Sequence, residues 1–112
     1  MAGKNYPRTP DGRYFVSKSR LWRCTDPGLE DGERRKWVKA LMKARLAVRD
    51  ADGEEAEREA RARVHEAKVA LGERGPVWWD DGAPDENRCH PKNTSYAEWW
   101  ASLAESERAA GS

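Results

Sequence analysis

The sequence predicts an all-α protein: an antiparallel two-helix hairpin and a C-terminal helix, with an extended N-terminal segment. Two observations lead to this fold class. Apolar residues recur at spacings of 4, 3 and 4 in two neighbouring segments, separated by a short polar break with a glycine. Six of the 112 residues are tryptophans, and each buried tryptophan removes roughly 150–250 Å² from water. These anchors compensate for a chain that is only 38% hydrophobic.

The first helix is predicted over residues 31–50. Its apolar stripe consists of Trp37, Leu41, Ala44 and Val48. At about 100° per residue, these four positions fall within roughly 60° of arc on one helix face. Asp31 is the expected N-cap, because a carboxylate there accepts bonds from the free N–H groups of the first turn. The segment Asp50-Ala51-Asp52-Gly53 ends the helix.

The second helix is predicted over residues 54–72, with Gly72 as a candidate C-cap. Its stripe consists of Ala60, Val64, Ala67 and Leu71. The connection between the two helices is short, so they must be antiparallel neighbours. Trp37 should therefore contact Ala67 or Leu71, and small residues on the second helix let the two axes approach closely.

The first helix carries a second apolar strip, and a two-helix hairpin cannot cover it. The strip consists of Val38, Met42 and Leu46. A C-terminal helix from residue 94 or 95 to about 106 is the expected cover; Ser95 and Glu98 have the spacing of a capping box. Its apolar face is Tyr96, Trp99, Trp100 and Leu103. A partner, or a second copy forming a four-helix bundle, is the alternative cover.

The remaining segments complete the expected organisation. Residues 1–12 form a flexible arm, residues 13–106 a single helical-hairpin domain and residues 107–112 a tail. Within the domain, residues 14–16 and 21–24 are either two short strands or extended chain lying on the helices.

Composition indicates a cytoplasmic protein. No stretch approaches the ~20 apolar residues of a membrane-spanning helix, and residues 1–7 do not resemble a signal peptide. A reducing compartment would keep Cys24 and Cys89 as thiols. We therefore expect no membrane interaction.

Catalytic and metal-binding patterns are not found in the sequence. The candidate soft metal ligands are Cys24, His65, Cys89 and His90, and they lack the paired, tight spacing of a structural zinc site. No nucleophile elbow, phosphate-binding loop or dinucleotide fingerprint occurs. We expect a protein that is not an enzyme and uses no cofactor or metal.

The distribution of charge leaves nucleic-acid binding open. Residues 1–49 carry 13 Lys and Arg against 5 Asp and Glu, whereas residues 50–112 carry 8 against 15. Basic groups with an interleaved aromatic suit phosphate contact and base stacking. The candidate residues are Arg20, Trp22, Arg23, Arg35, Lys39 and Lys43. Alternatively, the two halves neutralise each other.

A tryptophan-bearing loop after the second helix favours a protein-interaction or adaptor module, with nucleic-acid binding as the alternative. Adjacent pairs such as Trp78-Trp79 and Trp99-Trp100 cannot easily bury both rings in one small core, so one ring of each pair should stay partly exposed. The candidate partner-binding residues are Trp78, Trp79, Asp80, Asp81, Asp85, Asn87 and Arg88. The partner is an unknown protein, and a homodimer is possible.

Several stretches resemble a family of short bacterial proteins without an established activity. They are residues 64–88, Arg20-Leu21-Trp22-Arg23, residues 41–45 and residues 92–99, and they span most of residues 20–100. Some family members carry an automatic label tying them to Tol-type biopolymer transport, which the lack of a membrane segment does not fit. The resemblance implies a bacterial protein and adds no catalytic residue.

Overall fold

Residues 6–112 are described by a computed structural model, so the first five residues of the expected arm lie outside the described part. Contacts divide the chain into two units within the segment that we expected to be one domain. Unit 2 comprises Thr25–Asp80, and unit 1 comprises the residues before and after it. Unit 2 contains the helical hairpin, and unit 1 contains a small antiparallel sheet and the C-terminal helices.

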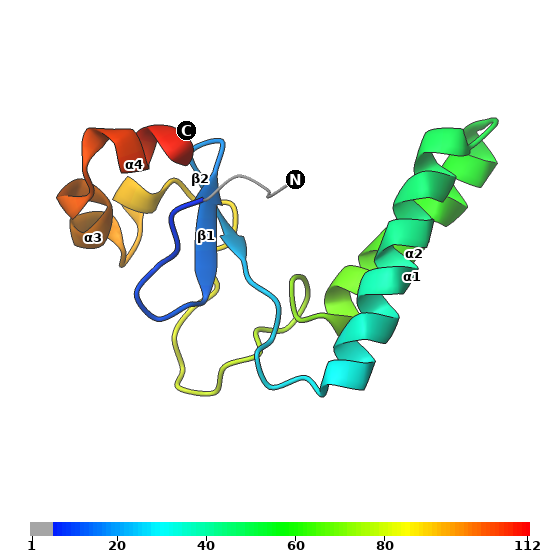
Figure 1. The fold of residues 1–112 in the computed structure, drawn as a ribbon, viewed down its shortest axis with the longest axis horizontal. Coiled ribbons are helices and arrows are strands. Elements are labelled where there is room, and N and C mark those ends of the chain that lie inside the picture. Colours follow the sequence, from blue (N-terminus) through cyan, green and yellow to red (C-terminus); the bar gives the residue numbers. More distant parts are fainter. Residues whose placement is uncertain (1–5) are drawn as a thin grey trace. The chain divides into compact units, whose positions relative to one another are not determined.

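The helical hairpin of unit 2 is confirmed. Helices α1 (Asp31–Asp50) and α2 (Glu54–Ala70) lie side by side and are joined at one tip (Figure 1). Leu41, Ala67 and Leu71 form the centre of the contact. The half-buried residues packed against this centre are Leu29, Trp37 and Val64. Trp37 therefore contacts the part of α2 that its spacing predicts. The expected N-cap is wrong by one residue, because Glu30 precedes the helix and no side chain caps it.

Helix α2 ends in a tight turn centred on Gly72, which has φ +81°. The N–H of Gly72 donates to the carbonyl of Val69 at 3.0 Å, and the N–H of Glu73 donates to that of Lys68 at 2.9 Å. This pair of bonds is the Schellman motif, and glycine supplies the left-handed residue that it needs. The chain packs closely around this turn. A Cβ at Gly72 would lie 2.9 Å from atoms of Asp26 and Trp78.

The all-α prediction is wrong, because unit 1 contains a β-hairpin. Strands β1 (Tyr14–Ser17) and β2 (Arg20–Arg23) pair antiparallel, with Tyr14 opposite Arg23. Alternate residues are buried, as expected of a strand with one face on a core. Lys18 and Ser19 connect the strands with φ of 52° and 62°. Such a turn usually carries Asn or Gly, so the sequence lacks the residues that most strongly predict a hairpin turn.

Two further segments flank this hairpin. On the β1 side, the N–H of Val16 donates to the carbonyl of Pro7, and the N–H of Thr9 to that of Tyr14, both at 2.9 Å. On the β2 side, Leu21 exchanges backbone bonds with Arg88 and Cys89 at 2.7 and 2.9 Å. Segments before and after the hairpin in the sequence therefore bond to its two edges, and the first of them belongs to the segment expected to be an arm.

The single C-terminal helix of the prediction is divided in two. A short 3-10 turn, η1 (Pro91–Asn93), precedes α3 (Ala97–Ser102), and α4 (Glu105–Ala110) follows and runs into residues 107–112, which were expected to be a tail. Leu103 and Ala104 between them are extended. After α4, the carbonyl of Gly111 accepts the N–H of Ser19 at 2.7 Å.

Side-chain hydrogen bonds explain these C-terminal differences. Glu86 accepts both the N–H and the hydroxyl of Ser95, at 2.9 and 2.7 Å, so Ser95 does not cap the helix. The hydroxyl of Ser102 donates to the carbonyl of Trp99, and Glu107 accepts the N–H of Ala104. The chain therefore ends one helix and begins another where periodicity predicts continuity.

The second strip on α1 is exposed, and the aromatic residues expected to cover it make contacts within unit 1. Val38, Met42 and Leu46 remain 40%, 60% and 49% exposed. The C-terminal aromatic residues pack within unit 1: Tyr96 lies edge-on to Tyr14, and Trp100 lies edge-on to His90. Within residues 6–112, no helix is both long and apolar enough to cross a membrane.

Candidate functional site

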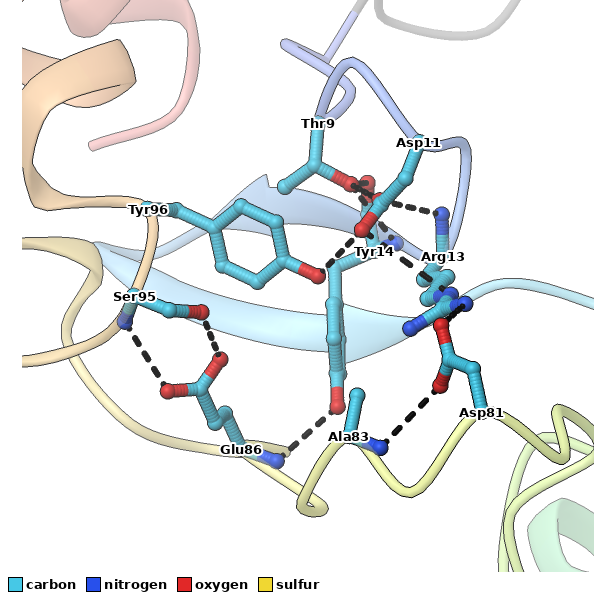
Figure 2. A network of polar contacts seen from close by, with 9 residues as sticks. All are labelled: Thr9, Asp11, Arg13, Tyr14, Asp81, Ala83, Glu86, Ser95 and Tyr96. Carbon is cyan, nitrogen blue, oxygen red and sulfur yellow. Dashed lines mark hydrogen bonds and ion pairs between the residues drawn. The ribbon is translucent and has the colours of Figure 1, made fainter.

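The loop that follows unit 2 forms a polar network with the N-terminal part of unit 1 (Figure 2). Asp81 binds the Arg13 guanidinium through an ion pair and accepts the N–H of Ala83 at 3.0 Å. These bonds hold the pKa of the Asp81 carboxyl below its usual value, with the Arg13 bond as the main cause. Asp81 therefore joins two segments that are far apart in the sequence.

A second part of the network is built on Glu86. Its N–H donates to the hydroxyl of Tyr14 at 2.9 Å, and its carboxylate binds Ser95, two residues before α3. Burial raises the pKa of the Tyr14 hydroxyl, whose oxygen accepts this backbone N–H. Glu86 thus connects the sheet to the C-terminal helices.

Asp11 completes the network from the other side. It accepts hydrogen bonds from the hydroxyls of Tyr96 and Thr9, both at 2.7 Å. Burial raises the pKa of Asp11, but the bonds from Tyr96, Thr9 and the backbone of Arg13 outweigh it and lower the pKa overall. Burial, followed by the bond to Asp11, raises the pKa of Tyr96.

Arg23 is the charged group buried most deeply in the same unit. Its side chain is 1% exposed and forms an ion pair with Asp85 at 2.8 Å. Asn87 accepts the backbone N–H of Arg23 at 2.9 Å, and Asp85 accepts that of Asn87 at 3.0 Å. The loop residues Asp85 and Asn87 therefore hold the edge of β2.

These contacts give three of the seven predicted partner-binding residues an internal role. Asp81, Asp85 and Asn87 are bonded within unit 1. Trp78, Trp79 and Asp80 belong to unit 2, so the predicted surface is divided between the units. Asp80 and Arg88 are exposed.

Each adjacent tryptophan pair has one buried and one half-buried ring, as expected. Trp79 and Trp100 are both buried, whereas Trp78 and Trp99 are half-buried. The rings of Trp78 and Trp79 meet edge-on, with centroids 5.1 Å apart.

The predicted nucleic-acid residues are likewise divided between the units. Arg20, Trp22 and Arg23 lie on β2 in unit 1, and of these three Arg20 is exposed, Trp22 half-buried and Arg23 buried. The indole N–H of Trp22 donates to the carbonyl of Ser17 at 2.9 Å. The other three residues, Arg35, Lys39 and Lys43, are exposed on α1.

The most apolar exposed surface of the described chain lies on α1. Val38, Met42 and Leu46, here called the α1 strip, follow one another four residues apart, about 6 Å along the axis. The segment Arg34–Arg49 carries seven Lys and Arg and no Asp or Glu. The α1 strip is therefore surrounded by positive charge.

Two shallow grooves lie between the helices of unit 2, and sequence reasoning missed both. One is lined by Trp37, Ala40, Lys43, Ala44, Arg63 and Glu66, and has a volume of about 340 Å³. The other, the arginine groove, is lined by Arg45, Val48, Arg61, Val64 and Arg74, and has a volume of about 320 Å³. In the arginine groove, Arg45 and Val48, and likewise Arg61 and Val64, are three residues apart. Helical periodicity therefore places each arginine beside a valine of the core stripe, and this signal was present in the sequence.

Potential metal ligands do not converge in residues 6–112: no group of three or more His, Cys, Asp and Glu side chains is placed to hold an ion. Cys24 is buried and Cys89 is exposed. His90 accepts the N–H of Lys92 through Nδ1 at 3.1 Å, which helps to start η1.

Comparisons with known proteins found no matching family model, no matching curated protein and no matching solved structure.

Proposed function

We propose that this chain is a protein-interaction module that uses the outer face of α1 to bind an acidic amphipathic helix of a partner protein. The single observation behind the proposal is the α1 strip, where three large aliphatic side chains stay 40–60% exposed on a helix with a strongly basic surface. Contiguous exposed apolar surface of this kind is typical of interaction sites.

The chemistry of the strip selects the partner. Its apolar residues follow the spacing that an amphipathic helix recognises when it lies along another helix. The surrounding cations, which include Arg35, Lys39 and Arg49, favour a partner with acidic residues beside its apolar stripe. A second α1 in the same position would bring like charges together, so a symmetric α1–α1 dimer is disfavoured.

The same surface suits a protein better than a nucleic acid. Phosphate contacts need exposed cations, but they gain little from three aliphatic side chains in the middle of the face. Arg23, one of the cations expected to bind nucleic acid, has its side chain buried against Asp85. We also propose that the partner is met in the cytoplasm, where a reducing environment would keep Cys24 and Cys89 as thiols.

The test measures binding of a synthetic helical peptide with leucines on one face and glutamates beside them. We expect Met42→Glu to weaken binding about tenfold or more, since it places a charge in the strip and repels the glutamates. Ala62→Glu is the matched control: Ala62 is exposed on α2, outside the strip. A peptide with serines for the leucines keeps the charge and should bind much more weakly.

Three results would contradict the proposal. In the first, Met42→Glu and Ala62→Glu weaken binding equally, so that charge alone decides the affinity. In the second, an oligonucleotide or an anionic lipid vesicle binds more tightly than the peptide. In the third, the acidic peptide does not bind at all.

A further inference from the structure

The arginine groove has an unusual combination of charge and apolar surface. Its described lining contains three guanidinium groups and two valines, and no carboxylate. The groove is formed entirely within unit 2, by α1, α2 and the chain just after α2. Its volume of about 320 Å³ lies at the lower end of the range for small-molecule sites.

Local structure explains why these groups converge. On α1, Arg45 lies one turn before the half-buried Val48, and on α2, Arg61 lies one turn before the half-buried Val64. The helices are antiparallel neighbours, so both pairs lie at the same side of the contact. The valines form an apolar floor, and the arginines border it.

The third cation depends on the turn at Gly72. After the Schellman motif, the chain returns toward α2, and a guanidinium nitrogen of Arg74 lies 3.4 Å from Nδ1 of His65. Arg61 is also bonded to Glu57, one turn earlier, at 3.1 Å. Since a guanidinium has five N–H donors, that pair leaves Arg61 able to bind a further anion.

Electrostatics and shape together specify a ligand. Three positive charges around one small groove repel one another, and a bound anion relieves this repulsion. Guanidinium groups bind phosphate in a bidentate manner, and a dianion matches several of them better than a single carboxylate does. We infer that the arginine groove binds a phosphate monoester carried on an apolar body, with the phosphate on the arginines and the body on Val48 and Val64.

The probes are phenyl phosphate, inorganic phosphate and phenol, titrated into the full chain with methyl resonances observed by NMR. We expect phenyl phosphate to shift the methyl signals of Val48 and Val64 saturably. Inorganic phosphate should bind more weakly, because it lacks the apolar body, and phenol should leave the signals unchanged. A short phosphotyrosine peptide is then compared with phenyl phosphate. Tighter binding of the peptide indicates a phosphate carried on a protein, and tighter binding of phenyl phosphate indicates a free metabolite.

Variants identify the groups responsible. Arg45→Gln and Arg74→Gln should each raise the Kd of phenyl phosphate about tenfold. The matched control is Arg58→Gln, which removes an exposed cation of α2 outside the groove. Far-UV circular dichroism checks that each variant keeps its helices.

Two results would overturn the inference: no saturable shift of the valine signals up to about 10 mM ligand, or equal weakening by Arg58→Gln and Arg45→Gln. The second result would mean that overall charge, and not the groove, attracts the anion. The inference is independent of the α1 strip, so Met42→Glu should leave phenyl phosphate binding unchanged even if it abolishes peptide binding.

Discussion

Replacing Gly72 with alanine tests how the hairpin of unit 2 is closed. Gly72 has a left-handed backbone and closes the Schellman turn of α2. An added Cβ would lie 2.9 Å from a carbon of Asp26 and 2.9 Å from a ring carbon of Trp78. The substitution therefore introduces two separate costs, one in the backbone and one in packing.

The expected loss of folding free energy is the sum of these two costs. A non-glycine residue in the left-handed region costs roughly 1–2 kcal/mol. Forcing a methyl group into a closely packed site costs about 1–3 kcal/mol more. We expect Gly72→Ala to lower the free energy of unfolding by about 2–5 kcal/mol in total.

Gly75→Ala is the matched control for the backbone term. Gly75 lies in the same unit with φ +74°, but its Cβ would meet only Val69 methyls at 3.5–3.6 Å, an ordinary contact. We expect it to cost about 1–2 kcal/mol, measured as for Gly72→Ala by urea unfolding and far-UV circular dichroism. Equal losses in the two variants, or no loss in Gly72→Ala, would refute the close approach of Asp26 and Trp78.

Two further predictions concern unit 1. Because hydrogen bonds hold the pKa values of Asp11 and Asp81 below the ordinary 3.8, both carboxylates stabilise the fold fully above that pH, and this contribution is lost as pH falls through their lower folded-state values. Acid titration by near-UV circular dichroism should show this loss and Asp81→Asn should reduce it; an unchanged profile would contradict the assignment. Asp85→Asn should cost about 1–3 kcal/mol in urea unfolding because it weakens the bond to the buried Arg23, whereas the exposed Asp80→Asn should cost almost nothing, and equal losses would refute a special role for Asp85.

Local patterns predicted unit 2 well. The stripes around Leu41 and Ala67 fix both helices, their contact and the turn at Gly72, since periodicity and a short connection leave a single pairing. Only details at the ends differ, such as Glu30 in place of Asp31 at the start of α1. End positions depend on a few hydrogen bonds, and sequence patterns determine these poorly.

Unit 1 was predicted poorly because its structure depends on bonds between distant residues. The strands are four residues each, and Lys18 and Ser19 make their turn without Asn or Gly. Glu86 removes the expected cap of the C-terminal helix by binding Ser95. The local pattern offered two short strands at residues 14–16 and 21–24 as one of two alternatives, and the pairing of β1 with β2 decides between them.

The candidate sites show the same division. The apolar residues and cations of the α1 strip were visible as a second stripe, but whether anything covered it was decided by the tertiary structure, in which Tyr96 and Trp100 pack within unit 1. The aspartates of the tryptophan loop were expected on a binding surface, whereas Asp81 and Asp85 bind arginines of their own unit.

The sequence by itself determined the helical hairpin, its core stripe and the partial exposure of one ring in each tryptophan pair, because these depend on neighbours within a few turns. Only the tertiary structure decided the β-hairpin, the division of the C-terminal helix, the burial of Arg23 and the convergence of Arg45, Arg61 and Arg74. Those features depend on particular hydrogen bonds, ion pairs and packing contacts that a helical period does not specify, and such contacts leave no periodic signal in the sequence.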